Sequence, residues 1–356
     1  MKHWSFELKC GAITIAVALL GLFGILTVFA VQNTGLALHQ AACLVLALTV
    51  MYFAGKIPFD VYRRYTFPGV ILSILLLAGL PFFGVKINGM SGWYRIGGIS
   101  IQISEFAKIF LLLGLAEISG GNEKEYLRAA KVFMMVLVFA VLLLLQPDLG
   151  TLLVYLAALF AVLLLGNFHW RYIAALPAVL IPAAGGVLWH YPHAWRRLTA
   201  FLDPGADPAG SGWHILQFQL TVSRGGWFGM KTPEAVWNYA YLPLAYNDSA
   251  FAAMLECLGL IGALVPVSLY ILLFAALGML SDEPALTAQR RLFIRLAAAV
   301  LAIQVLLHIS VNLTLIPPTG LNLPFFSCGG SSLISGALLL GCALSAAYFP
   351  DKKPEI

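Results

Sequence analysis

The sequence predicts an all-α, polytopic membrane protein with about ten transmembrane helices. Of its 356 residues, 61% are hydrophobic and only 10% are charged, whereas roughly a quarter of the residues in a soluble domain are charged. Apolar runs recur along the whole chain, and most approach the ~20 residues that a helix needs to cross a bilayer. One long loop, residues 190–249, interrupts this pattern. We therefore expect residues 1–356 to form a single integral membrane domain, with a large extracytoplasmic loop between its seventh and eighth helices.

The expected helices are the apolar runs at residues 10–31, 36–55, 67–84, 106–118, 132–145, 149–166, 172–189, 251–280, 292–313 and 333–349. The fourth and fifth runs are short, so we expect loop residues to extend both helices. The first run is longer than the apolar region of a signal peptide, and no small-residue cleavage site follows it, so we retain it as a helix. The sequence shows no internal repeat and no second domain.

The distribution of basic residues predicts which side each connection faces. If the amino terminus is cytoplasmic, most of the 21 Lys and Arg residues fall on cytoplasmic connections, as the positive-inside rule requires. Both termini are then cytoplasmic. The net charge of +5 reflects insertion and membrane contact and gives no sign of nucleic-acid binding. The cytoplasmic connections contain no glycine-rich phosphate loop, which argues against an ATP-driven machine.

The connections on the outward side hold the unusual sequence. They comprise residues 86–108, 146–151, 190–248 and 316–332, and they are rich in Gly, Pro, Trp and Asn. This composition favours ordered turns and re-entrant backbone over flexible linkers.

Ionisable residues near the outward ends of the apolar runs mark a candidate site. Each costs roughly 2.5–3.5 kcal/mol to insert, so such groups usually face a partner or a cavity. They are Glu105, Lys108, Asp148, Asp248 and Glu256, with Arg196 and Arg197 in the long loop.

Most of these groups also have a purely structural interpretation. Asp148 and Asp248 both occupy positions that suit a helix N-cap. Glu105 and Lys108 are three residues apart on one helical face, so they can pair with each other. Glu256 is different, because it lies about two turns into an apolar run, where an unpaired carboxylate needs a proton or a cation. A cavity facing Glu256 is therefore the favoured interpretation.

The remaining polar residues of the long loop have ordinary alternatives. Arg196 and Arg197 lie among aromatic residues and suit an interfacial anchor. The histidines lack metal-ligand spacing, so we expect each to be a satisfied or interfacial imidazole. They are His190, His193, His214 and His308.

Five outward motifs, in order along the chain, resemble those of the SEDS family (shape, elongation, division and sporulation proteins), whose types include RodA and FtsW. The motifs are NGMSGWYRIG at 88–97, QISEFAK at 102–108, QPDLGT at 146–151, YLPLAYNDSAFAAMLECLGLIG at 241–262 and PPTGLNLPFFSCGGSS at 317–332. The similarity runs from the second helix to the last and includes the family's ten-helix count.

The resemblance implies a peptidoglycan glycosyltransferase that polymerises lipid II, an undecaprenyl-diphosphate-linked disaccharide pentapeptide. The reaction takes place on the outer face of the bacterial cytoplasmic membrane, beside a class B penicillin-binding protein that cross-links the peptides. Asp248 matches the family's catalytic aspartate and suits a general base for the acceptor hydroxyl. The leaving diphosphate needs arginines or a divalent cation such as Mg or Mn. No nucleotide is needed, because the substrate already carries its activated bond.

The substrate-binding residues that we expect share the outward side with Asp248. They are Arg196, Arg197, Glu105, Lys108, Arg95, Asp148, Glu256, Ser331 and Ser332.

The sequence departs from the family pattern at four positions: Gly92 replaces an arginine, Ile103 a proline, Leu244 a glutamate and Cys328 a tyrosine. The segment between Gly229 and Tyr241 is also shorter and lacks a glutamine-lysine pair. Two other functions fit the same sequence, namely a lipid II flippase or other lipid-linked-sugar transporter and a non-catalytic scaffold for a penicillin-binding protein. A role in division is not distinguished from one in elongation.

Overall fold

The computed structural model describes residues 4–30, 34–87, 90–230, 241–242 and 244–348. Several sequence-based expectations fall on other residues and lie outside this description. They concern the chain ends, the first two residues of the motif at 88–97, the short segment at 231–240 and the side chain of His193.

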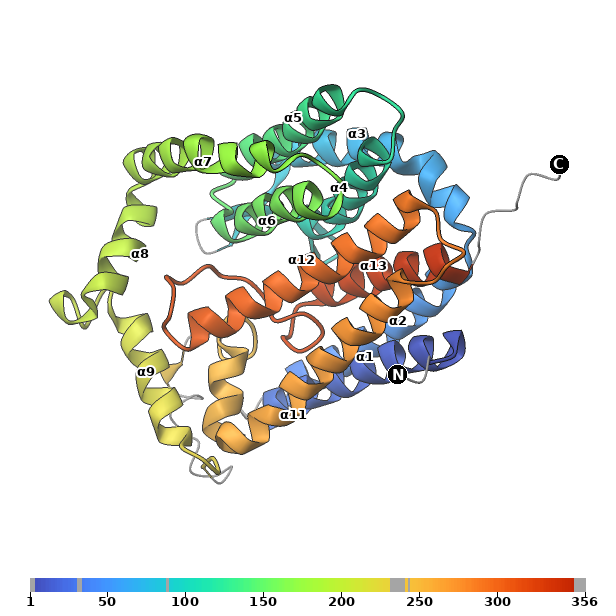
Figure 1. Ribbon diagram of the computed structural model, residues 1–356. Helices are drawn as coiled ribbons and strands as arrows, with labels where there is room; N and C mark the ends of the chain where they lie inside the picture. The colour runs from blue at the N-terminus through green and yellow to red at the C-terminus, as the bar shows by residue number, and fades with distance from the viewer. Residues whose placement is uncertain (1–3, 31–33, 88–89, 231–240, 243, 349–356) are drawn as a thin grey trace.

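Among the described residues, ten helices overlap the ten predicted spans and form one bundle (Figure 1). They are α1 (Phe6–Ala30), α2 (Thr34–Lys56), α3 (Phe59–Phe83), α4 (Ile103–Ser119), α5 (Glu125–Leu144), α6 (Leu149–Leu165), α7 (Trp170–His190), α11 (Ala250–Ser281), α12 (Ala288–Asn312) and α13 (Gly330–Tyr348). Eight of the described helices are long and apolar enough to cross a membrane, and α6 is a shorter apolar helix. The prediction of an all-α, multi-pass membrane protein is confirmed.

The expected extension of the two short helices is also confirmed. Helix α4 begins three residues before its apolar run, and α5 begins seven residues before its own. The added turns contain most of the charged residues of these helices' first turns, including Glu105, Glu125 and Arg128.

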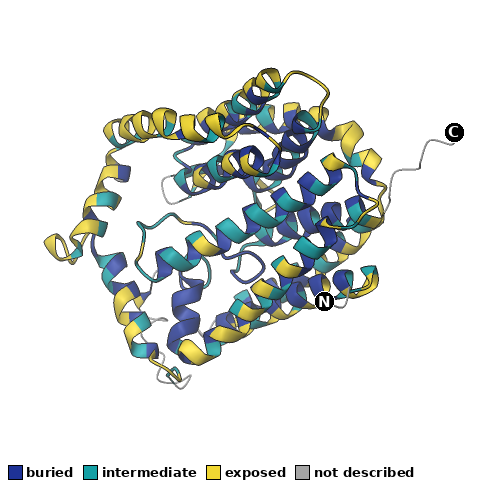
Figure 2. Ribbon diagram, viewed as in Figure 1, coloured by how far each residue is buried: buried dark blue, intermediate teal, exposed yellow. Residues whose placement is uncertain are grey.

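The core lies along α4, α12 and α13, which are mostly buried in the middle of the bundle (Figure 2). Small residues permit close packing there, because apolar side chains gain little from association when lipid is the alternative. A Cβ at Gly341 of α13 would lie 2.6 Å from the Cβ of Ala54 on α2. Helix α7, in contrast, is peripheral, and Leu176 is its one buried residue among those described.

The two ends of the described chain lie on the same side of the bundle. The rings of Phe6 in α1 and Tyr348 in α13 are 5.8 Å apart. This arrangement fits an even number of membrane crossings.

A small antiparallel sheet connects α3 to α4, where the sequence indicated ordered turns. Its strands are β1 (Val85–Ile87), β2 (Met90–Ile96) and β3 (Ile99–Gln102), in the order β1-β2-β3. Gly97 and Gly98 join β2 to β3 with φ angles of 57° and 85°, which the two-residue hairpin turn requires. The sheet delivers the chain from the surface directly into the buried start of α4.

The long loop between α7 and α11 contains helices that the hydropathy pattern did not predict. They are α8 (Pro192–Leu202), the 3-10 turn Pro204–Ala206 and α9 (Trp213–Gly225), and with α7 they run along one edge of the bundle (Figure 1). Phe218 anchors α9, since its side chain is fully buried in a cluster with Ala252 and Ala253 of α11.

Helix α11 is broken at Gly259, whereas the sequence predicted one uninterrupted helix. Gly259 adopts φ 67° and ψ −175°, a conformation open essentially to glycine alone. The backbone between Gly226 and Met230 occupies the break. Its carbonyls accept hydrogen bonds from the amides of Leu260 (3.0 Å) and Ile261 (3.1 Å). A helix can break at membrane depth only where other groups satisfy its backbone in this way.

Replacing Gly259 with alanine should destabilise the protein by roughly 1–3 kcal/mol, because the backbone conformation is strained for an L-residue. A Cβ at this position would also collide with the backbone nitrogen of Gly229. The change is measurable as unfolding of the purified chain in mixed micelles. Gly278→Ala is the matched control in the same helix, since a Cβ there meets nothing within 4 Å and should stabilise the helix by about 0.5–1 kcal/mol. Equal effects of the two substitutions would contradict the importance of the break.

Candidate active site

Asp248 lies in the last turn before α11, and it does not cap that helix. The N-cap residue is Ser249, and no side chain of the cap residue bonds to the first turn. The turn closes on Leu244, whose carbonyl accepts hydrogen bonds from the amides of Asn247 (2.8 Å) and Ser249 (3.3 Å). The capping alternative for Asp248 is therefore wrong, and its carboxylate is directed elsewhere.

Asn312, at the end of α12, caps α11 from outside. Its Oδ1 accepts a hydrogen bond from the amide of Ala252 at 2.9 Å, and its Nδ2 donates to the carbonyl of Asp248 at 2.9 Å. The side chain is completely buried. One amide thus satisfies the first turn of α11 and fixes the backbone of Asp248 at the same time.

The segment between α12 and α13 holds the turn from its other side. Ser327 Oγ donates to the carbonyl of Asn247 (2.7 Å), and the amide of Cys328 donates to the carbonyl of Tyr246 (2.7 Å). The Asn247 amide, oriented to satisfy its neighbours, donates to the carbonyls of Tyr246 and Cys328. The motif at 317–332 therefore supports the aspartate through backbone contacts.

The Asp248 carboxylate lines a pocket of about 270 Å³ together with Arg196 and Arg197 of α8. Three of the predicted site residues thus meet in one place. Burial raises the pKa of Asp248 to about 6, and the positive charge of Arg197 opposes this shift. Arg197 Nη1 also lies 3.5 Å from the carbonyl of Pro318, which is a long contact for a hydrogen bond.

His214, near the start of α9, lines the same pocket, although its sequence context indicated only an ordinary imidazole. Its ring stacks on Phe218 with centroids 4.6 Å apart. Burial and then the charge of Arg197 lower the pKa of His214 to about 4, so the ring is neutral at pH 7. Its Nε2 is buried without a hydrogen-bond partner among the described groups. Sequence spacing carries no signal for this residue, because only the folded loop brings α9 beside Asp248.

Gly320 also lines the pocket. Its φ is +74°, and a Cβ there would lie 3.7 Å from Oδ2 of Asp248. A glycine at this position keeps side-chain atoms away from the carboxylate and suits the left-handed backbone.

Glu105 and Lys108 pair with each other inside the bundle, away from the Asp248 pocket. Their charged atoms lie 2.8 Å apart, and both side chains are buried. Lys108 also donates to Gln304 Oε1 (3.1 Å), and Ser335 donates to Glu105 (3.1 Å). The network joins α4, α12 and α13, which agrees with the intrahelical pair that the spacing allowed.

Asp148 is the N-cap of α6, as its position indicated. Its Oδ1 accepts a hydrogen bond from the amide of Thr151 at 3.0 Å, and its Oδ2 lies 3.4 Å from the side-chain nitrogen of Gln102. Burial raises the pKa of Asp148, while the bonds from Thr151 oppose the shift. Ser331 accepts a hydrogen bond from the amide of Gln102 at 3.1 Å. Asp148 and Ser331 therefore both hold the junction between β3 and α4.

Glu256 has a cation as its partner, where the sequence favoured a cavity. Arg224 Nε of α9 lies 2.9 Å from the buried Glu256 carboxylate, just before the break in α11. Two other predicted residues also lie apart from the Asp248 pocket. Arg95 is exposed on β2, and Ser332 is half-buried in the first turn of α13.

The sequence profile of the FtsW/RodA/SpoVE family of cell cycle proteins matches residues 8–351. The chain belongs to this family. It is 32% identical to the probable peptidoglycan glycosyltransferase FtsW of Coxiella burnetii, with 97% of each protein covered. It is 35% identical to the protein of the same name from Alkalilimnicola ehrlichii, covering 88% of this chain and 82% of that protein. The predicted membership of the SEDS family is confirmed.

Two solved structures share the fold of this family member. One, described as "Structural coordination of polymerization and crosslinking by a peptidoglycan synthase complex", contains a chain that matches with a TM-score of 0.79 and 30% identity, covering 93% of this chain and 95% of that one. The other is the rod shape determining protein RodA of Thermus thermophilus, with a TM-score of 0.71, 26% identity, and coverage of 96% and 97%.

The departures from the FtsW/RodA pattern fall at positions with different structural demands. Cys328 supports the Asp248 turn through its backbone amide, so that contact does not require the family's tyrosine. Leu244 has a φ of +48°, an uncommon conformation for a side chain of this size. Gly92 is buried in β2, and Ile103 begins α4. None of the four departures lies among the residues that line the Asp248 pocket.

Removing one partner of the buried Glu105–Lys108 pair should destabilise the protein far more than replacing both partners. Lys108→Met leaves an uncompensated buried carboxylate and should lower the free energy of unfolding by roughly 3–5 kcal/mol. The double variant Glu105→Gln/Lys108→Met should recover most of this loss. Chemical unfolding of the wild type and these variants in mixed micelles measures the differences in stability.

An ion pair on the surface provides the control for this comparison. Lys131 pairs with Glu123 while both side chains stay about half exposed, so Lys131→Met should cost less than ~1 kcal/mol. A double variant that is as unstable as Lys108→Met would contradict the ion-pair interpretation.

Proposed function

We propose that this chain is a peptidoglycan glycosyltransferase that polymerises lipid II. The observation that carries the proposal is the meeting of Asp248, a carboxyl with a pKa of about 6, with Arg196 and Arg197 in one pocket. The names of the relatives from Coxiella burnetii and Alkalilimnicola ehrlichii support the same reaction class.

The chemistry joins two lipid-linked sugars. The 4-hydroxyl of an acceptor GlcNAc attacks the anomeric carbon of a MurNAc, a new carbon–oxygen bond forms, and the bond to the lipid diphosphate breaks. Asp248 accepts the hydroxyl proton, and its raised pKa brings the base closer to the pH at which it works. The departing diphosphate keeps the bonding electrons, so its charge grows as the bond breaks. Arg196 and Arg197 stabilise that charge by charge-assisted hydrogen bonds.

A divalent cation is not required by this scheme. The Asp248 pocket contains one carboxylate among its lining residues, and the described residues include no group of three or more His, Cys, Asp or Glu side chains placed to hold a metal ion. These residues therefore do not fit a metal site built from protein ligands alone. The two guanidinium groups supply the positive charge, which is the first of the two alternatives, and the alternative of Mg or Mn stays a prediction.

We place the reaction on the outer face of the bacterial cytoplasmic membrane, with both termini in the cytoplasm. The bias of basic residues supports this orientation, and the contact between Phe6 and Tyr348 supports termini on one side. In this arrangement the whole chain is one membrane domain, and the loop at 190–249 lies outside. The chain resembles a chain of a peptidoglycan synthase complex that coordinates polymerization and crosslinking. This likeness supports a class B penicillin-binding protein as partner.

Asp248→Asn should lower the rate of lipid II polymerisation by roughly 100-fold or more, because the reaction loses its general base. The assay uses the purified chain with its class B partner and follows glycan strands by gel. Asp203→Asn, at an exposed aspartate of the same loop, should leave the rate unchanged. Polymerisation by the Asp248 variant at the normal rate would exclude the catalytic assignment. Movement of lipid II across liposomes by a wild type that makes no strands would favour a transporter.

The pH dependence should follow the ionisation of Asp248. Only the deprotonated carboxylate can accept a proton, so kcat/KM should rise with pH through about 6 and level off above it. Arg197→Gln removes a charge that lowers this pKa, so the inflection should move to higher pH. Arg171→Gln, at an exposed site on α7, should leave the inflection in place. A shift to lower pH in the Arg197 variant would contradict the assignment.

A further inference from the structure

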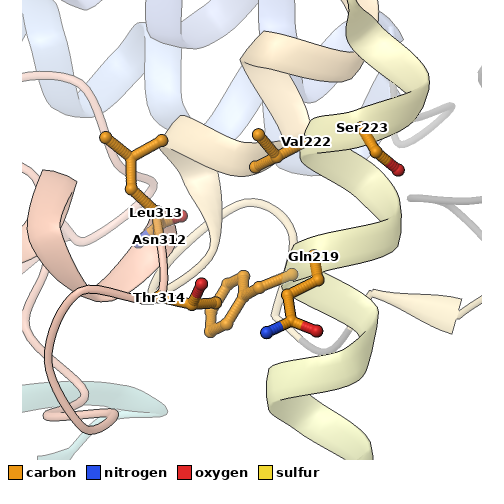
Figure 3. A pocket seen from close by; sticks show the side chains of 7 residues that line it. Gln219, Val222, Ser223, Asn312, Leu313 and Thr314 are labelled. Carbon is orange, nitrogen blue, oxygen red and sulfur yellow. The ribbon is translucent and has the colours of Figure 1, made fainter.

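A second pocket, of about 240 Å³, lies between α9 and the end of α12. Gln219, Val222 and Ser223 line it from α9, and Asn312, Leu313 and Thr314 line it from the other side (Figure 3). Phe218 completes the lining. Every lining residue is described, and none carries an ionisable side chain.

The second pocket shares a wall with the pocket of Asp248. Phe218 lines both pockets. Val311 lines the Asp248 pocket, and the next residue, Asn312, lines the second pocket. Asn312 also donates a hydrogen bond to the carbonyl of Asp248. One side chain, Asn312, therefore separates a molecule in the second pocket from the backbone of Asp248.

The lining suits an uncharged, hydrogen-bonding ligand with apolar faces. The Gln219 amide and the Thr314 hydroxyl offer donors and acceptors, while Phe218, Val222 and Leu313 offer apolar contact. Without a cation, the pocket is a poor site for a diphosphate. A sugar with an acetamido group combines hydroxyls, an amide, a methyl group and apolar ring faces.

A polymerase of lipid II holds a donor and an acceptor at once; each carries a diphosphate on its MurNAc unit, whereas its GlcNAc unit is uncharged. The pocket with Arg196 and Arg197 suits the charged unit. We propose that the second pocket binds an uncharged N-acetylhexosamine unit and positions it beside Asp248. This inference rests on the proposed function. The unit belongs either to the incoming acceptor or to the growing strand.

Gln219→Trp tests the inference, because Gln219 is exposed and its side chain reaches into the pocket (Figure 3). Filling the pocket should raise the KM for lipid II about tenfold or more, with a smaller change in kcat. Gln219→Ala removes the amide, leaves space, and should raise KM less. Leu220→Trp is the matched control, since Leu220 is exposed on the same helix and does not line the pocket. An unchanged KM for Gln219→Trp beside an active wild type would overturn the inference and leave the proposed function intact.

A binding measurement separates the pocket from catalysis. N,N′-diacetylchitobiose, an uncharged disaccharide of N-acetylglucosamine, is added to the intact chain in nanodiscs and followed by saturation-transfer NMR. Binding should persist in Asp248→Asn and Leu220→Trp and disappear in Gln219→Trp. Binding that survives in Gln219→Trp would overturn the inference, whether or not the wild type polymerises lipid II.

The products identify which sugar unit occupies the pocket. If it holds the acceptor, Gln219→Trp slows every coupling, including the first one between two lipid II molecules. If it holds a unit of the growing strand beyond the disaccharide at the reacting end, the first coupling proceeds normally and short products accumulate. Either pattern supports the sugar site, whereas normal strands formed at the normal rate under limiting lipid II would contradict it.

Discussion

The geometry around Asp248 depends on one buried amide, the side chain of Asn312. A backbone group left without a partner in a dry interior costs several kcal/mol, and the turn before α11 exposes such groups. Asn312 satisfies the amide of Ala252 and the carbonyl of Asp248 together, while the segment after α12 satisfies the carbonyls of Tyr246 and Asn247. The aspartate is thus held by its backbone, which leaves its carboxylate directed into the pocket.

The need of buried polar groups for partners also divides the charged residues of the outward half into two sets. Those that lie deep in the bundle have partners: Glu105 with Lys108, and Glu256 with Arg224. The groups that line the pocket carry charges arranged for a ligand. There, Asp248 faces two arginines whose positive charge suits a diphosphate. Ion pairing therefore compensates the buried Glu105 and Glu256, whereas Asp248 lies in the pocket, where the proposed reaction needs it.

Much of the site was predictable, and the failures have specific causes. Asp248 was predicted from its motif, and Arg196 and Arg197 were predicted as basic residues of a loop on the same side of the membrane. His214 and Asn312 were missed, since an imidazole in a loop and an amide at a helix end have no distinctive spacing. The partner of Glu256 was missed because Arg224 lies 32 residues away in the sequence on a helix that hydropathy does not reveal.

The sequence by itself determined the membrane class, the order of the ten spans and the family, because apolar length and local motifs are properties of contiguous residues. The tertiary structure decided the break at Gly259, the helices α8 and α9 of the long loop, and the two pockets that share Phe218. These features arise when segments far apart in the chain satisfy one another's backbone and side-chain groups. Such pairings depend on three-dimensional proximity, which residue spacing along the chain does not encode.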